Sequence, residues 1–144
     1  MLKLSKKADY ALIALRHLAL DNGQRAWSAS EIARIYGISA PLMAKVLQRL
    51  ARSGLVEARQ GSGGGYLLAR DPAQITALDV VRSIDGPLAI ASCFSAQGVC
   101  EQSLTCTVRE PLRQVNESIL AMLDRMTLLG MIQEQPARVV ELRS

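Results

Sequence analysis

Aromatic residues are scarce in this sequence, and their scarcity argues against one class of nucleic-acid-binding protein. Phe, Trp and Tyr together make up 3% of the 144 residues, whereas proteins that bind single strands stack successive bases on aromatic side chains. Internal repeats are absent too, and the only low-complexity tract is the glycine-rich run at 61–65. Binding to duplex DNA needs no aromatic platform, so that function remains open.

Long apolar runs are also missing. The sequence contains no stretch of about 18 consecutive apolar residues, the length that crosses a membrane, and its first nine residues do not form the apolar core of a secretory signal. A hydrophobic content of 49% is nevertheless enough to bury a core. We therefore expect a soluble cytoplasmic protein without a membrane partner, built as one ordinary domain plus an extra element.

Charge is distributed unevenly along the chain. Residues 1–70 carry eleven Lys or Arg and four acidic residues, a net charge of +7, whereas residues 71–144 carry six Arg and nine acidic residues, a net charge of −3. A basic half joined to an acidic half indicates that the first part meets phosphate groups and that the second has another task. An uneven but merely solvated surface is the alternative that charge alone leaves open.

Hydrophobic periodicity and capping residues predict three helices in the basic half, over about 5–20, 28–36 and 40–53. The second begins with a capping box, in which Ser28 stands three residues before Glu31. Gly37 supplies a tight turn between the second and third helices, and Pro41 lies in the first turn of the third, where its missing N–H costs nothing. Two helices joined by a short glycine turn match the helix-turn-helix arrangement.

Two short apolar segments, 55–58 and 66–69, flank the glycine run and predict antiparallel strands around a flexible loop, that is, a wing. A further capping box at Thr76 and Asp79 predicts a short helix over 78–84. The fold class we expect is therefore mainly α with a small β-wing, a winged helix-turn-helix DNA-binding domain over residues 1–85. A long C-terminal dimerisation helix completes it.

The open face of the third helix and the wing hold the residues we expect to meet double-stranded DNA. They are Pro41, Ala44, Lys45, Gln48 and Arg49, with Arg52 beyond them, and Arg59, Gln60 and Ser62 on the wing. The glycine run fails as a dinucleotide fingerprint, because Tyr66 stands where the third glycine belongs and a strand follows. No close dithiol is present either, so we expect no enzyme.

Residues 107–130 predict one long helix with a heptad seam, and a seam of this length buries its apolar face against a second helix. The seam consists of Val108, Leu112, Val115, Ile119, Met122, Met126 and Leu129. We interpret it as a homodimer element, with packing on the helix's own domain as the alternative. Beyond it, residues 131–144 show little pattern and are expected to form a flexible tail.

The three cysteines, Cys93, Cys100 and Cys106, all fall in the aperiodic segment 86–106. An odd number in a cytoplasmic chain argues against a disulfide framework. The gaps of six and five residues are longer than those of a zinc knuckle, which makes structural zinc a weaker interpretation. Several thiolates in one loop can instead hold an iron–sulfur cluster. Spacing alone leaves unligated or redox-active thiols equally open.

Four segments carry a resemblance to a known family. They are Leu4–Leu12 (LSKKADYAL), Gly37–Ser39 (GIS), Gly63–Arg70 (GGGYLLAR) and the three-cysteine loop. Over nearly its whole length the chain resembles the Rrf2 family of bacterial transcription regulators, most closely the regulators of iron–sulfur cluster assembly associated with isc or suf operons. The resemblance implies a homodimer that binds a cluster through Cys93, Cys100 and Cys106, with [2Fe–2S] favoured over [4Fe–4S].

Two departures from the family pattern affect the cluster and the operator. Relatives of the isc type have a His three residues after the last cysteine, where this sequence has Arg109. Nitric-oxide-sensing relatives use an N-terminal Asp of the other subunit, and Asp9 matches that position, so Asp9 is the leading candidate for fourth ligand. The alternatives are His17, Glu101, Glu110 or no protein ligand. A Glu that discriminates operator classes in the family is replaced by Ala44.

These features together lead to one functional expectation and one alternative. We expect a homodimeric repressor whose cluster state sets its affinity for a pseudo-palindromic operator and which controls genes for iron–sulfur cluster assembly. The alternative is a metal-free regulator of the same family that senses thiol oxidation or a cysteine metabolite.

Overall fold

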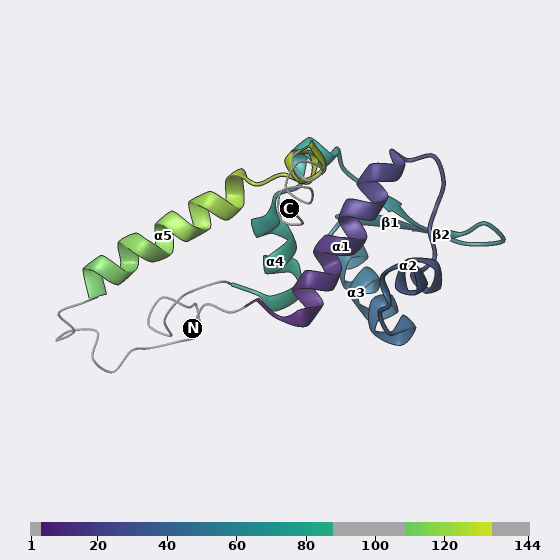
Figure 1. Ribbon diagram of the computed structural model, residues 1–144, viewed down its shortest axis with the longest axis horizontal. Helices are drawn as coiled ribbons and strands as arrows, with labels where there is room; N and C mark the ends of the chain where they lie inside the picture. The colour runs from purple at the N-terminus through teal and green to yellow at the C-terminus, as the bar shows by residue number, and fades with distance from the viewer. Residues whose placement is uncertain (1–3, 88–108, 134–144) are drawn as a thin grey trace, which may run out of the picture.

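The computed structural model describes residues 4–87 and 109–133. Its first four helices pack together with a two-stranded sheet at one side, and one long helix projects on the side away from that sheet (Figure 1). The elements in chain order are α1 (Lys6–Asp21), α2 (Ala29–Tyr36), α3 (Ala40–Arg52), β1 (Val56–Arg59), β2 (Gly65–Leu68), the short 3-10 helix η1 (Pro72–Gln74), α4 (Ala77–Asp85) and α5 (Arg109–Arg125). The protein is thus mainly helical with a small antiparallel sheet, as the sequence predicts.

Local capping chemistry fixes where the helices begin. The Ser28 hydroxyl accepts a hydrogen bond from the Glu31 amide while the Glu31 carboxylate accepts one from the Ser28 amide, and Thr76 and Asp79 do the same at α4. These reciprocal bonds satisfy amides that have no partner within the helix. Both predicted capping boxes are therefore confirmed.

The start of α1 is tied to the end of α4. The Ser5 hydroxyl caps α1 by accepting a hydrogen bond from the Ala8 amide. The same hydroxyl donates to the Asp85 carboxylate at 2.6 Å, and the Ser5 amide donates to that carboxylate at 3.2 Å. Two helices 80 residues apart in the sequence are therefore held together at their ends.

The wing is anchored by a third extended segment, at Trp27, that no sequence pattern predicts. β1 and β2 pair antiparallel, with Val56 opposite Leu68. On the other edge of β2, the amides of Trp27 and Tyr66 each donate to the other residue's carbonyl, at 3.0 and 2.7 Å. Gly65, at φ +148°, lies so close to the Trp27 backbone that a Cβ there would overlap its carbonyl group.

The core fills the space between α1, α3, α4 and the sheet. Its largest fully buried side chains include Leu15 of α1, Ile32 of α2 and Leu47 of α3. A residue far along the chain, Leu128, is also fully buried in the same cluster. The chain beyond α5 therefore returns to complete the core of the N-terminal part.

The long C-terminal helix is shorter than the sequence predicts. α5 ends at Arg125, whereas the heptad pattern extends the helix to residue 130. The backbone leaves the helix because residues 126–128 pair with the segment before α4. The Ala77 amide donates to the Met126 carbonyl at 2.7 Å, and the Leu128 amide donates to the Ile75 carbonyl at 3.0 Å. These bonds form a bridge between Thr76 and Thr127.

A second short helical stretch covers residues 128–133. Met131 and Ile132 pack against the core, so the expectation of a flexible tail is wrong for residues 131–133. The apolar side chains there pack within the same chain. Residues 134–144 lie outside the described part of the chain.

Candidate nucleic-acid interface

Helices α2 and α3 form a helix-turn-helix whose inner faces are buried. Gly37 ends α2 at φ +67°, a backbone conformation that glycine adopts without strain. Ser39 caps α3, and Pro41 stands in its first turn. The inner face of α3 buries Met43, Val46, Leu47 and Leu50. One face of α3 is therefore committed to the core, and the opposite face is available for a partner.

The outer face of α3 presents the residues that the sequence places there. Pro41, Lys45, Gln48 and Arg49 are exposed, while Ala44 is half-buried. On the wing, Arg59, Gln60 and Ser62 are exposed as well. These positions fit contact with a nucleic acid, and such contact stays a prediction for each residue.

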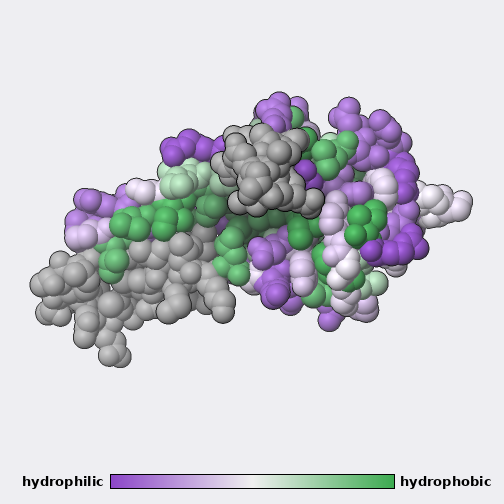
Figure 2. Space-filling model, viewed as in Figure 1, coloured by the Kyte–Doolittle hydropathy of each residue, from purple (hydrophilic) through white to green (hydrophobic). Residues whose placement is uncertain are grey.

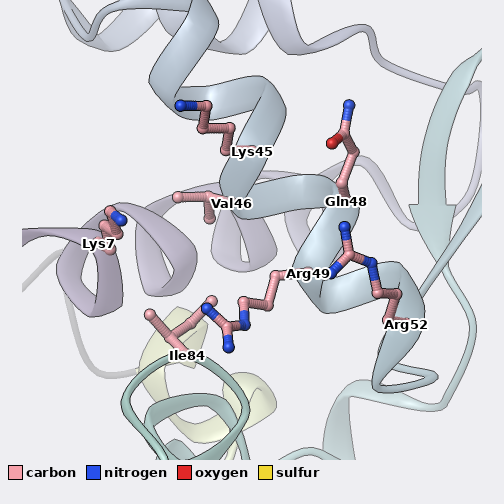
Figure 3. Close-up of a pocket in the computed structure, with 7 residues that line it drawn as sticks. All are labelled: Lys7, Lys45, Val46, Gln48, Arg49, Arg52 and Ile84. Atoms are coloured by element: carbon pink, nitrogen blue, oxygen red, sulfur yellow. The ribbon is translucent and has the colours of Figure 1, made fainter.

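A groove beside α3 gathers positive charge from two helices (Figure 3). This basic groove, of about 330 Å³, is lined by Lys7, Lys45, Val46, Gln48, Arg49, Arg52 and Ile84. Lys7 comes from α1 and Ile84 from α4, whereas the others come from α3. Sequence reasoning missed Lys7, because only the packing of α1 against α3 brings it there.

The cations of the basic groove have no acidic partner within residues 4–87 and 109–133. The ion pairs in that part of the chain join Arg25 to Glu31, and Arg113 to both Glu110 and Glu117. Lys45 and Arg49 are not among them. An exposed cation without an intramolecular partner can bind phosphate without first breaking a bond.

A small polar-aromatic cluster joins α1, α2 and the extended segment at Trp27. The His17 ring meets the rings of Trp27 and Tyr36 edge to face, at centroid distances of 4.3 and 5.5 Å. Its Nδ1 lies 2.9 Å from the Tyr36 hydroxyl. The Arg25 guanidinium stacks on Trp27 at 3.5 Å from the ring centroid. Trp27 and Tyr36 thus pack around the His17 ring.

Two pKa values are shifted in and beside this cluster. Burial lowers the pKa of His17 below its ordinary value, and the nearby cations Arg25 and Arg16 lower it further. The Arg25 guanidinium, which donates to the Glu31 carboxylate at 2.8 Å, lowers the pKa of Glu31 to about 2. The neutral form of His17 and the charged form of Glu31 are thus the favoured ones in the folded protein.

Helix α5 exposes an apolar face, seen as a green band in Figure 2. Leu112, Val115 and Met122 are 36%, 49% and 57% exposed. Met126 and Leu129, which the heptad seam includes, are exposed but lie beyond the end of α5. Ile119 is half-buried, and Val108 lies outside the described residues.

Most of the residues expected to hold a cluster lie outside the described part of the chain. This applies to Cys93, Cys100, Cys106 and Glu101, and within residues 4–87 and 109–133 no three His, Cys, Asp or Glu side chains gather as a metal site.

Three candidates for the fourth ligand are described. Asp9 is exposed in the first turn of α1, and no hydrogen bond or ion pair engages its carboxylate within the described ranges. His17 is poorly placed because its Nδ1 bonds Tyr36 and its Nε2 is buried. The Glu110 carboxylate binds Arg113.

None of the described helices is long and apolar enough to cross a membrane.

The chain is similar to known proteins in its sequence and in its structure. It is 34% identical over 136 residues to protein aau3 of Rhizobium meliloti (strain 1021), covering 94% of this chain and 88% of that protein.

Solved structures similar to this one include those of two named regulators. The T. potens IscR structure has a TM-score of 0.74 at 31% identity, with 95% of this chain and 90% of that chain covered. The structure of CymR, the global cysteine regulator of B. subtilis, has a TM-score of 0.73 at 29% identity, with 91% and 96% covered. Residues 4–134 match the family described as Rrf2, iron-dependent transcriptional regulator. The chain therefore belongs to the Rrf2 family, whose members are transcriptional regulators and not enzymes.

Proposed function

We propose that this protein is a cytoplasmic, homodimeric repressor that binds a pseudo-palindromic operator and senses iron–sulfur cluster status. The observation that carries DNA binding is the outer face of α3, where exposed cations stand beside a wing and have no acidic partner among the described residues. A helix of this kind enters the major groove, and a wing contacts the adjacent backbone or minor groove.

Salt dependence of binding to the gene's own upstream DNA tests the docking surface. Lys45→Ala and Arg59→Ala should each weaken binding about three- to tenfold, because each removes a phosphate contact and the counterion release that accompanies it. Arg125→Ala, at the end of α5, removes the same charge outside the helix-turn-helix and serves as the control. Equal effects of all three variants would count against this surface.

The apolar face of α5 supports the homodimer. Val115 and Met122 are among the most exposed large hydrophobic residues of the described chain, and they lie seven residues apart on one helix. Side chains at that spacing share a face and pack against a second helix in coiled coils. A two-fold dimer would bind a palindromic operator, because each half-site would meet one α3.

The donor set fits an iron–sulfur cluster in its chemistry. Three thiols at Cys93, Cys100 and Cys106 are ligands that such clusters prefer, and the carboxylate of Asp9 is exposed and unpaired within the described residues. A bound cluster would supply a group whose presence or loss reports iron or oxidants. The cysteines lie between α4 and α5, so ligation would change how the DNA-binding part is joined to the dimer helix.

Anaerobic reconstitution tests the cluster. The wild-type protein should take up iron and sulfide and acquire visible absorption, whereas a triple Cys→Ser variant should stay colourless. Operator affinity should differ at least fivefold between the loaded and cluster-free wild type, a typical coupling between sites, and should not change in the triple variant. Equal affinity of the two wild-type forms would reject cluster sensing while leaving DNA binding intact.

The fourth ligand has its own test. Asp9→Ala should alter the visible and Mössbauer spectra of the loaded protein, because replacing a carboxylate ligand changes the electronic structure of its iron. His17→Gln should leave the spectra as in the wild type, since His17 is engaged with Tyr36. If His17→Gln altered the spectra and Asp9→Ala did not, His17 and not Asp9 would be the fourth ligand.

A metal-free thiol or cysteine-metabolite sensor is the second candidate. It is favoured by the likeness to the CymR structure, described as that of a cysteine regulator, and by Arg109 at the position where isc-type relatives have His. A protein that stays colourless after anaerobic reconstitution and loses or gains DNA affinity on thiol oxidation would establish this function in place of cluster sensing.

A further inference from the structure

The exposed surface of α3 carries two adjacent stripes of different chemistry. One stripe is uncharged and consists of Pro41, Ala44 and Gln48. The other is cationic and consists of Lys45, Arg49 and Arg52. Within each stripe the residues are three or four apart, so each follows one line along the helix surface.

The cationic stripe faces α1 and α4 across the basic groove. In Figure 3 the Arg49 side chain lies across the groove toward Ile84, whereas the Gln48 side chain points away from both Lys7 and Ile84. Val46 and Ile84 give the groove an apolar floor. The two stripes therefore face different surroundings, although they share one helix.

The groove concentrates positive charge that nothing in the described protein neutralises. Four of its seven lining residues are cationic and none is acidic. None of the four takes part in an ion pair within residues 4–87 and 109–133. A concave surface of one sign of charge above a low-dielectric floor focuses the electrostatic field and favours an anion.

The far wall of the groove is held in position. Lys7 lies two residues after Ser5, whose hydroxyl and amide bind the Asp85 carboxylate of α4. The neighbouring Ile84 is buried against the same helices. Because α1 and α4 are joined at this point, Lys7 is presented from a fixed backbone and not from a loose terminus.

We propose that the basic groove holds a backbone phosphate of duplex DNA, bound between Lys7 of α1 and Arg49 and Arg52 of α3, while the uncharged stripe faces the base edges. This inference rests on the proposed DNA-binding function and assigns Lys7 to it. Phosphate contacts fix the position of a protein on the duplex without reading sequence, whereas base contacts specify it.

Affinity measured as a function of salt, on two duplexes, tests the assignment. One duplex is the gene's own upstream region, and the other has the same length and composition in scrambled order. Lys7→Ala should weaken binding to both by a similar factor, about three- to tenfold, and reduce the slope of log K against log salt by about 0.9. Gln48→Ala should change the ratio between the two duplexes and leave the slope unchanged.

Lys6→Ala is the matched control, because Lys6 is an exposed neighbour that does not line the groove. It should weaken binding less than Lys7→Ala and leave the salt slope as in the wild type. Lys7→Arg keeps the charge and should therefore have the wild-type slope of log K against log salt. If Lys7→Ala unfolds, Arg52→Gln tests the groove instead, and it should reduce the slope in the same way.

The possible results distinguish a failure of the phosphate assignment from a failure of DNA binding itself. A Lys7→Ala slope equal to that of the wild type, with Lys45→Ala still reduced, would overturn the phosphate assignment and leave DNA binding standing. A loss confined to the upstream duplex would assign Lys7 to base reading instead, which also overturns it. Wild-type protein that binds neither duplex at any salt would reject the proposed function itself.

Discussion

The part of the protein from α1 to α4 and the helix α5 differ in where their apolar side chains go. The first part buries the side chains of four helices and a sheet edge in one core, to which Leu15 and Leu47 contribute. α5 leaves Val115 and Met122 about half exposed, although they lie on one face. The first region therefore buries its apolar side chains, with Leu128 from beyond α5 completing the core, whereas α5 has an apolar face that only a further element can cover.

The two regions also treat their charges differently. On α5, Arg113 binds Glu110 and also Glu117, at 2.5 Å, so its positive charge is neutralised within the helix. On α3, Lys45 and Arg49 have no such partner within the described residues. The contrast indicates that α5 is built to meet a surface without strong charge and α3 to meet an anion.

The largest expected effect comes from placing charge on the exposed face of α5. Val115→Asp combined with Met122→Asp should raise the dimer dissociation constant at least a hundredfold, because two carboxylates per helix would be desolvated at the interface. The far-UV spectrum and unfolding midpoint of the α1–α4 core should change little. Sedimentation equilibrium measures the first quantity, and circular dichroism the second.

A control for this prediction lies on the same helix. Gln114 is exposed and stands off the heptad seam, so Gln114→Asp adds one carboxylate per helix away from the proposed interface. It should leave the oligomeric state unchanged. If the doubly charged variant remained a dimer, the pairing through α5 would be wrong, and α5 would pack on its own subunit.

The next largest expected effect is a loss of stability where the wing meets the Trp27 segment. Gly65→Ala should destabilise the protein by about 2–4 kcal/mol, because the added Cβ would overlap the Trp27 carbonyl group and stand 2.7 Å from the Ser28 amide nitrogen. Gly61→Ala is the matched control. Gly61 also has a positive φ, +93°, but open space around it, so only the backbone cost of about 1 kcal/mol applies. Urea unfolding of the two variants, followed by Trp27 fluorescence, measures the difference.

The smallest expected effect is a dependence of folding stability on pH, caused by His17. Since burial lowers the pKa of His17, the unfolded chain binds its proton at a higher pH than the folded chain, and stability should decline as the pH falls through about 6.5. His17→Gln should flatten that decline. Thermal midpoints between pH 7.5 and 5 give the test, and equal slopes for both proteins would show that His17 does not titrate there.

A separate decline is expected at lower pH from Glu31. Its pKa is lowered from 4.5 to about 2, so the folded protein retains the charged carboxylate where the unfolded chain takes up a proton. The stability that this carboxylate provides is present above pH 4.5 and is lost as the pH falls toward 2. This decline begins at a lower pH than that of His17, because the unfolded chain protonates a Glu near 4.5 and a His near 6.5.

Features encoded by local chemistry were predictable from the sequence. The capping boxes at Ser28 and Thr76 fix helix starts through atoms three residues apart, and Gly37 fixes a turn through its own backbone. The wing strands were placed to within one residue, as β1 begins at Val56 and β2 at Gly65. The 3-10 helix after Asp71 was not anticipated, because three residues are too few to show a period.

Features that depend on distant packing were not predictable. Lys7 joins the basic groove because α1 packs beside α3, and nothing in its neighbourhood in the sequence signals that contact. The heptad pattern runs on through Met126 and Leu129, yet the helix ends at Arg125, because hydrogen bonds to the segment before α4 hold the backbone elsewhere. An apolar residue has the same sequence signature whether it faces a partner subunit or its own core.

The bridge between Thr76 and Thr127 joins the end of α5 to the start of α4, so a small rotation there displaces the far end of α5. The 17 residues of α5 extend about 25 Å from this joint, at 1.5 Å of rise per residue. A rotation of 10° about the joint would therefore move the far end of α5 by about 4 Å. Two backbone hydrogen bonds at the bridge, 2.7 and 3.0 Å long, hold the angle between the axes of α5 and α4. In a dimer joined through α5, they would also set the distance between the two copies of α3.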